Sequence, residues 1–200
     1  MKVAIQGVEG CFHQIAANDY FNKTVDVLCC ESFPKLVTEV QANTNCTVGI
    51  MAIENSIAGS IMQNYNLLQQ AGLYITGETY SPIVQNLIAL PGTKLEGITE
   101  VYSHPMAIYQ CYDFLNSLPN IKLVEKDDTA GSVKEIKKKN LQGKAAIASS
   151  LAAEIYGMEI LAPSIETNKK NYTRFLIISP EANKDLENTS KASLYFSVPH

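Results

Sequence analysis

The chain has 200 residues, a formal net charge of −4 and 46% hydrophobic residues, which suits one large globular domain or two small lobes. The negative charge and the lack of a basic stripe argue against a nucleic-acid partner. No apolar run approaches membrane-spanning length, so no membrane association is expected. No apolar leader precedes the first expected strand, which favours a cytoplasmic protein. The five cysteines fit no zinc or CxxC spacing, and free thiols are expected.

Strands and helices alternate along the whole chain. Short apolar runs between turn residues predict strands, and apolar residues at helical spacing, such as Phe33, Leu36, Val37 and Val40, predict helices. We expect strands over residues 2–6, 25–30, 47–53, 73–79, 83–90, 101–103, 121–124, 145–148, 158–161 and 174–179. We expect helices over residues 11–21, 33–42, 57–70, 105–118, 129–139 and 151–156. This alternation predicts an α/β fold with parallel sheets flanked by helices.

Small and polar residues gather in the loops that follow the expected strands. Ligands of parallel sheets bind beyond the carboxyl ends of the strands. The loops are therefore candidate binding regions, and their side chains suit hydrogen-bonding pockets and helix caps. They comprise residues 7–10, 54–60, 103–104, 127–132 and 149–150.

Each loop also has a simpler structural interpretation. Asn55 or Ser56 could cap the next helix, and His104 could cap or orient the helix that begins one residue later. The carboxylates at 127–128 could act as a pair, although capping is the commoner role. The glycines of residues 7–10 lack the spacing of a dinucleotide fingerprint or a P-loop, and they fit a tight turn.

Arg174 is the only arginine, and the other 15 basic residues are lysines. Guanidinium is a planar fork that binds a carboxylate or phosphate through two hydrogen bonds, whereas ammonium is a hydrated point charge. Thr173 places a hydroxyl beside it, and a strand-like apolar run follows. Two interpretations stay open: a structural ion pair at a strand edge, or a small-anion site with a hydroxyl beside the charge.

Together and in this order, the loops resemble the catalytic region of the prephenate dehydratase family. The resemblance extends from residue 7 to about residue 179. Its most specific elements are Glu54-Asn55-Ser56 and Thr173-Arg174-Phe175. The remaining segments that carry it are residues 7–10, 52–59, 103–111, 128–131, 145–157 and 171–175.

The resemblance implies two α/β lobes like those of a type II periplasmic binding protein, with the active site in the cleft between them. Lobe 1 would comprise residues 1–79 and 177–190, and lobe 2 residues 80–176. Residues 191–200 look like the first strand of a truncated ACT-like domain, the family's phenylalanine sensor. Feedback by phenylalanine would require a complete ACT domain, and a homodimer or homotetramer is expected.

The activity implied is that of a lyase of phenylalanine biosynthesis (EC 4.2.1.51), which converts prephenate to phenylpyruvate with loss of carbon dioxide and water. Aromatisation drives the reaction, so no metal or other cofactor is expected. Thr173 matches the family's catalytic threonine at the leaving hydroxyl, and Arg174 would bind a carboxylate. Asn55 and Gln110 would orient the substrate, and Glu54 would orient its neighbours. A solvated surface position is the alternative for Gln110. Further substrate-binding residues are expected at Ser56, Ser103, His104, Thr129, Ser149 and Phe175.

Two positions depart from the family pattern. Residues 11–13 are Cys-Phe-His where a serine- or threonine-aromatic-serine run is frequent, and Met106 stands where glutamine is frequent. A competing hypothesis is a non-catalytic small-anion binding or sensory protein on the same fold, since a fold does not fix a function. A third is an assembly module that acts through the ACT-like tail.

Overall fold

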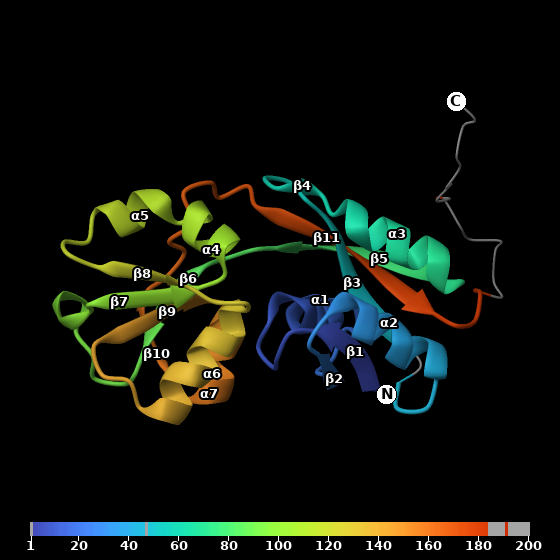
Figure 1. Ribbon diagram of the computed structural model, residues 1–200, viewed down its shortest axis with the longest axis horizontal. Coiled ribbons are helices and arrows are strands. Elements are labelled where there is room, and N and C mark those ends of the chain that lie inside the picture. The colour runs from blue at the N-terminus through green and yellow to red at the C-terminus, as the bar shows by residue number, and fades with distance from the viewer. Residues whose placement is uncertain (1, 47, 184–190, 192–200) are drawn as a thin grey trace.

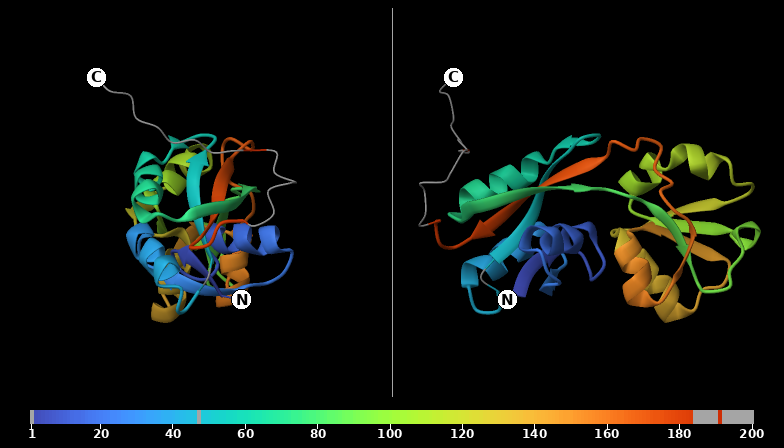
Figure 2. Two further views of the ribbon diagram at one scale, coloured as in Figure 1. Left: turned by 90° about the vertical axis from the view of Figure 1, so that its right-hand side faces the viewer. Right: turned by 180° about the vertical axis from the view of Figure 1, so that it is seen from behind.

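The computed structural model describes residues 2–46, 48–183 and 191 of the chain. Two α/β lobes lie end to end, and two extended segments of the chain join them (Figure 1). Seen from behind, both segments run along one side of the molecule between the lobes (Figure 2). The predicted two-lobed α/β fold is therefore confirmed.

Lobe 1 is built on a mixed sheet with helices on both faces. The strand order is β2-β1-β3-β11-β5, and β4 pairs with β3. Along β11, Phe175 and Ile177 pack on the face that carries α1, while Leu176 and Ile178 pack on the face that carries α2 and α3. The strands are β1 (Lys2–Gln6), β2 (Asp26–Cys30), β3 (Val48–Asn55), β4 (Gly59–Ser60), β5 (Tyr74–Pro82) and β11 (Tyr172–Ser179). The helices are α1 (Phe12–Phe21), α2 (Phe33–Ala42) and α3 (Met62–Ala71).

Lobe 2 repeats this three-layer arrangement on a smaller scale. Its sheet has the order β10-β6-β9-β7-β8, with α4 and α5 packed on one face and α6 and α7 on the other (Figure 1). The strands are β6 (Asn86–Ala89), β7 (Glu100–Ser103), β8 (Lys122–Glu125), β9 (Lys144–Ala148) and β10 (Glu159–Ala162). The helices are α4 (Pro105–Gln110), α5 (Tyr112–Asn116), α6 (Thr129–Lys139), α7 (Ser150–Tyr156) and the short 3-10 turn η1 (Leu95–Gly97).

The expectation of parallel sheets holds only in part, because both sheets are mixed. Pairs β1–β2 and β1–β3 in lobe 1, and β7–β8 and β7–β9 in lobe 2, are parallel as expected. However, β11 runs antiparallel to both β3 and β5, and β6 runs antiparallel to β9 and β10. β5, β6, β10 and β11 border the places where the chain passes between the lobes, and the short β4 also pairs antiparallel with β3.

Most expected elements shift by one to a few residues, and three of the differences affect the architecture. The helix predicted over 57–70 begins only at Met62, because residues 59–60 form β4. The helix predicted over 105–118 is divided into α4 and α5 at Cys111. The break predicted at residues 81–82 lies inside β5, and Pro82, which has no N–H to donate, is accommodated at the end of this edge strand.

The lobes also divide at different residues from those predicted. Because β5 and β11 pair from Tyr74 to Pro82, the sheet of lobe 1 includes residues 80–82 and 172–176, which were assigned to lobe 2. The chain passes between the sheets at residues 83–85 and 163–171. Residues 184–190 and 192–200, which include almost all of the predicted ACT-like strand, lie outside the described residues.

The turn after β1 joins lobe 1 to lobe 2 at a third place. Val8 N–H donates to Asp128 Oδ2 at 3.2 Å, and the Ser149 hydroxyl donates to the Gly10 carbonyl at 2.5 Å. Gly10 has φ +87°, and a Cβ there would lie 2.6 Å from the Cα of Ala152. Only glycine allows this approach without strain, so the turn packs directly against the N-terminal ends of α6 and α7.

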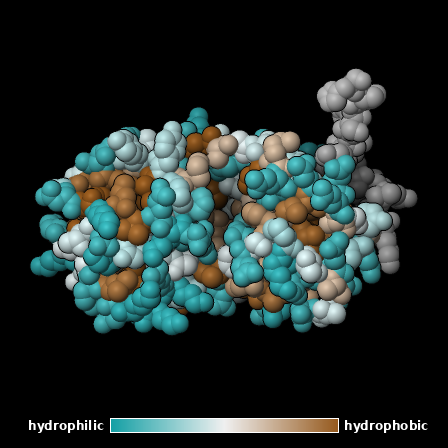
Figure 3. All heavy atoms as spheres, viewed as in Figure 1, coloured by the Kyte–Doolittle hydropathy of each residue, from teal (hydrophilic) through white to brown (hydrophobic). Residues whose placement is uncertain are grey.

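On the face seen in Figure 3, polar side chains surround apolar patches on both lobes, and a hollow lies at the junction of the lobes. None of the described helices is long and apolar enough to cross a membrane. The five cysteines are free thiols, as predicted.

Candidate active site

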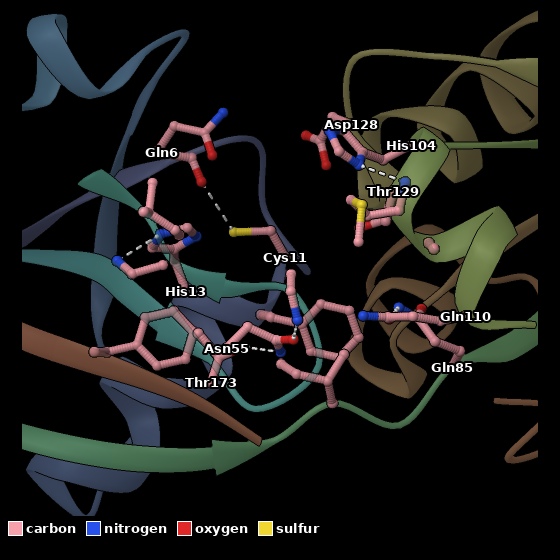
Figure 4. Close-up of a pocket in the computed structure, with 18 of the residues that line it drawn as sticks. Gln6, Cys11, His13, Asn55, Gln85, His104, Gln110, Asp128, Thr129 and Thr173 are labelled. Atoms are coloured by element: carbon pink, nitrogen blue, oxygen red, sulfur yellow. Dashed lines mark hydrogen bonds between the residues drawn. The ribbon is translucent and has the colours of Figure 1, made fainter. Parts of the chain in front are cut away.

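A cavity of about 270 Å³ lies between the lobes at the place predicted for the active site. Lobe 1 contributes side chains from β1, β3, β11 and the start of α1, and lobe 2 contributes side chains from α4 and from the start of α6 (Figure 4). Its described lining residues include two aspartates and no lysine or arginine.

A hydrogen-bonded pair, Asn55 and Thr173, lies on the lobe 1 side of the cavity (Figure 4). Asn55 Oδ1 accepts from the backbone N–H groups of Ile57 and Ala58, both at 2.9 Å, which fixes the orientation of the amide. Asn55 Nδ2 therefore donates to Thr173 Oγ1 at 2.9 Å and to Asn171 Oδ1 at 2.8 Å. Since its oxygen already accepts a hydrogen bond, Thr173 has a proton that it can donate to a molecule in the cavity.

Two glutamines lie on the opposite side of the cavity. Gln110, the last residue of α4, is buried rather than solvated, and Gln85 Nε2 lies 3.5 Å from its Oε1. Both side chains point from lobe 2 toward the side of the cavity that carries Asn55 and Thr173 (Figure 4). Gln110 was predicted as a site residue and lines the cavity, whereas Gln85 was not predicted.

His104, Asp128 and Thr129 form one corner of the cavity (Figure 4). His104 caps α4, because its Nδ1 accepts from Met106 N–H at 3.2 Å, and this places the proton of the neutral ring on Nε2. Asp128 caps α6 by accepting from Ala130 N–H at 3.1 Å. Burial raises the pKa of Asp128, and its backbone hydrogen bonds oppose that rise. Both capping interpretations therefore hold, and both residues still line the cavity.

Cys11 and His13 line the lobe 1 wall at the first position where the sequence departs from the family pattern. Burial raises the pKa of the Cys11 thiol to about 12, so the residue is a thiol and not a thiolate nucleophile. Burial lowers the pKa of His13 to about 4, so its ring is neutral near pH 7. His13 Nε2 accepts from Ala52 N–H at 3.3 Å, and the ring packs edge-on against Phe175 at 5.1 Å.

Arg174 lies on the other face of β11 from Thr173 and Phe175, and it does not line the cavity. Its Nη2 and Nε contact Glu78 Oε2 at 2.7 and 2.8 Å, and its Nη1 lies 3.9 Å from Glu54. Glu54 is likewise absent from the cavity lining. In this arrangement Arg174 forms the structural ion pair that was the alternative interpretation, and it lies outside the cavity in which it was expected to bind a substrate carboxylate.

Three predicted serines have structural partners and do not line the cavity. Ser56 donates to the Lys170 carbonyl at 3.1 Å and accepts from the backbone N–H of the returning strand. Ser103 is buried and donates to the Ile147 carbonyl at 2.7 Å. Ser149 caps α7 and holds the turn after β1. These hydroxyls stabilise the segments that form the cleft.

Six of the predicted site residues meet in the cavity: Asn55, His104, Gln110, Thr129, Thr173 and Phe175. The sequence reasoning missed Gln6 at the end of β1 and Gln85 between the lobes. Ligands of parallel sheets bind beyond the carboxyl ends of the strands. Gln6 could have been predicted in this way, because it ends a strand whose carboxyl end faces the cleft. Gln85 could not have been predicted in this way, because it lies just before β6 and not at the carboxyl end of a strand.

Residues 3–183 match the family described as prephenate dehydratase. The chain belongs to this family. Among curated relatives, it is 38% identical over 182 residues to arogenate dehydratase/prephenate dehydratase 6, chloroplastic, of Arabidopsis thaliana. That alignment covers 90% of this chain and 44% of the plant protein.

Two solved structures resemble this member of the prephenate dehydratase family with TM-scores of 0.81. One is prephenate dehydratase from Arthrobacter aurescens in complex with L-Phe, with 26% identity over 90% of this chain and 60% of that one. The other is GqqA, described as a quorum quenching acylase, with 29% identity over the whole of this chain and 68% of that one. The chain spans less than half the length of the first curated relatives that it matches.

Proposed function

We propose that this domain converts prephenate to phenylpyruvate with release of carbon dioxide and water, the dehydratase step of phenylalanine biosynthesis. The observation that carries the proposal is the Thr173 hydroxyl, whose oxygen accepts from Asn55 while its proton remains available to the cavity. Membership of the prephenate dehydratase family supplies the reaction, and this hydroxyl supplies the group that the reaction needs.

The reaction breaks two bonds of the substrate ring. The ring carboxylate leaves as carbon dioxide, its bonding electrons enter the ring, and the hydroxyl at the opposite carbon leaves as the ring becomes aromatic. Thr173 would donate a hydrogen bond to the departing hydroxide, which takes up one proton from solvent and leaves the site as water. An alcohol has too high a pKa for strong general-acid work, so the contribution of Thr173 is stabilisation of the negative charge that develops.

The other cavity residues would orient the substrate. Gln110 can contact the polar groups of the substrate from lobe 2, and His104 and Thr129 can contact them from the neighbouring corner. Phe175 and the neutral ring of His13 provide an apolar wall for the cyclohexadiene ring. Holding a reactant in one orientation supplies a large share of enzymatic rate enhancement.

Two other functions fit the geometry less well. An acylase such as the one described for GqqA needs an activated nucleophile, but the Cys11 pKa is raised to about 12 and Thr173 accepts its hydrogen bond from an amide rather than from a base. A non-catalytic anion-binding protein would need no hydroxyl that offers a proton to the cavity, whereas the dehydratase reaction uses one.

We also propose a cytoplasmic location and a homodimer or homotetramer. Control by phenylalanine would require the ACT-like domain, of which only Lys191 is described. These proposals rest on the family resemblance rather than on the cavity.

Turnover of prephenate by the purified chain, followed by the absorbance of phenylpyruvate, tests the function. Wild type and Thr173→Ser should both be active, because serine keeps the hydroxyl, and Thr173→Ala should lose roughly a hundredfold or more in kcat. An inactive wild type that binds prephenate would favour the binding-protein alternative. Full activity of a correctly folded Thr173→Ala protein would remove Thr173 from the reaction.

A further inference from the structure

Lobe 2 holds the turn of residues 7–10 through the backbone of the turn, and we call these contacts the interlobe clasp. Three side chains of lobe 2 bind three consecutive residues of the turn. The contacts are Asp128 Oδ2 with the Val8 N–H at 3.2 Å, the Tyr156 hydroxyl with the Glu9 carbonyl at 3.0 Å, and the Ser149 hydroxyl with the Gly10 carbonyl at 2.5 Å. Each side chain lies at an end of α6 or α7, so the clasp joins the turn to two helices of lobe 2.

The clasp lies across the cleft from the two segments of chain that join the lobes. Those segments run along one edge of the molecule, and the turn after β1 meets α6 and α7 nearer the opposite edge (Figure 1, Figure 2). The cavity lies between them, because it is lined by Ile83 and Gln85 from a crossing segment and by Asp128 from the clasp. Short connecting segments of this kind can act as a hinge. Separation of the lobes about that hinge would break the clasp and widen the cavity.

The turn leads directly into a wall of the cavity. Residues 11–13, which follow it, line the cavity from lobe 1, while Asp128 and Thr129 line it from lobe 2. Each lobe is built on its own sheet. The clasp therefore fixes the separation of two walls that face the same substrate, and with it the position of Thr173 in lobe 1 relative to Gln110 in lobe 2.

Tyr156 belongs to the clasp but does not line the cavity. Burial raises the pKa of its hydroxyl to about 12, so the group keeps its proton and donates to the Glu9 carbonyl near neutral pH. A change at this hydroxyl therefore acts on the clasp without altering any group that can touch the substrate.

We propose that Tyr156 and Asp128 are positioning residues that hold the turn of residues 7–10 against lobe 2 and so keep the cleft closed around the substrate. This inference rests on the proposed function. A weaker clasp lowers the fraction of free protein that is closed, and the apparent affinity for a substrate that needs the closed state falls in proportion. Bound substrate favours closure, so the chemical step keeps nearly the same rate. The expected signature is a raised KM with an almost unchanged kcat.

The test compares the kinetics of prephenate turnover in wild type, Tyr156→Phe and Asp128→Asn. Phenylalanine removes only the hydroxyl of Tyr156. Asparagine is as good a helix cap as aspartate, but it has an NH₂ group in place of one of the two oxygens that accept from Val8 and Ala130. Each variant should raise KM roughly three- to tenfold, the effect of one lost hydrogen bond, and leave kcat within about threefold.

Two controls separate the clasp from other effects. Tyr112→Phe changes an exposed tyrosine of lobe 2 that does not line the cavity, and KM should stay at the wild-type value. Asp127→Asn removes a negative charge from the same cavity as Asp128→Asn, but Asp127 makes none of the hydrogen bonds of the clasp. This control should lower KM for a dianion. A KM raised by Asp128→Asn is therefore not an effect of charge.

Small-angle X-ray scattering of the free proteins gives a measurement that does not depend on turnover. The double variant Tyr156→Phe/Asp128→Asn should have a larger radius of gyration than wild type, and urea melts confirm that it is folded. A wild-type KM in both single variants would overturn the inference, as would a lowered kcat without a raised KM, or a double variant with the radius of wild type. If wild type does not convert prephenate, the proposed function fails, and scattering of the free proteins still decides whether the clasp holds the cleft closed.

Discussion

The substitution Asn55→Asp tests the central feature of the site, the direction in which Thr173 donates its proton. Asparagine and aspartate have nearly the same shape, so the carboxylate can keep accepting from Ile57 and Ala58. The second carboxylate oxygen, however, replaces an NH₂ group that lies 2.8 to 3.2 Å from three acceptors, one of which is Thr173 Oγ1. Thr173 would then donate its proton to the new carboxylate and would no longer offer it to the substrate.

The expected loss in kcat is roughly 10²- to 10³-fold, the cost of removing one preorganised donor from a developing negative charge. The free energy of unfolding should fall by only about 1 to 2 kcal/mol, because two acceptors lose a donor at about 1 kcal/mol each. Asn171 reduces this loss, since its Nδ2 has no partner among the described residues and can turn toward the carboxylate.

The assay is phenylpyruvate formation at saturating prephenate, with a urea melt of each variant to confirm folding. Ser56→Ala is the matched control, because Ser56 belongs to the same turn but does not line the cavity. We expect the control to retain kcat within about threefold. If folded Asn55→Asp also keeps the wild-type kcat, the proposed orientation of the Thr173 hydroxyl is wrong.

Three further predictions concern stability and the ion pair. Gly10→Ala should cost about 3 kcal/mol in urea melts, because Gly10 has φ +87° and a Cβ would meet the backbone of α7 at 2.6 Å. Gly59→Ala, with φ +82° and nothing within 4 Å, should cost about 1 kcal/mol, and equal costs would contradict the close packing of the turn. His13 has a folded-state pKa of about 4 against 6.5 in the unfolded chain, so the unfolded state binds a proton first and stability should fall by up to about 3 kcal/mol from pH 6.5 to pH 4. His13→Phe should remove that slope, and an unchanged slope would show that other groups cause it. Arg174→Lys should cost about 1 kcal/mol through its contact with Glu78 and leave KM for prephenate unchanged, and a KM raised tenfold or more would restore Arg174 as a carboxylate anchor.

The order and type of most elements could be predicted from local patterns. Apolar spacing predicted α2 and α6 at their observed limits, and short apolar runs located the buried strands. The direction of β11 could not be predicted, because it depends on the chain returning from lobe 2 rather than on any local residue. The division of the helix at Cys111, where φ is −106° and ψ is 17°, was also missed.

The predicted site divides between residues at the cleft and residues that support it. The rule that ligands bind beyond the carboxyl ends of parallel strands located the cleft correctly, because the carboxyl ends of β1, β3, β7 and β8 all face the cavity. The rule says nothing about which side chain of a loop points inward. Asn55 lines the cavity and its neighbour Ser56 binds the returning strand instead, a distinction that depends on distances across the chain.

The side of the strand on which Arg174 lies follows from the alternation of side chains along a β-strand. The last strand was expected to begin at residue 174, which left Thr173 in the preceding loop and allowed both residues to face one ligand. The strand begins at Tyr172, and successive side chains of a strand point to opposite faces. Thr173 and Phe175 therefore share the cavity face, and Arg174 must take the other, where Glu78 lies on the paired strand β5. A motif of three adjacent residues within a strand can place at most two of them in one site, so Thr173 and Arg174 act from opposite faces of β11.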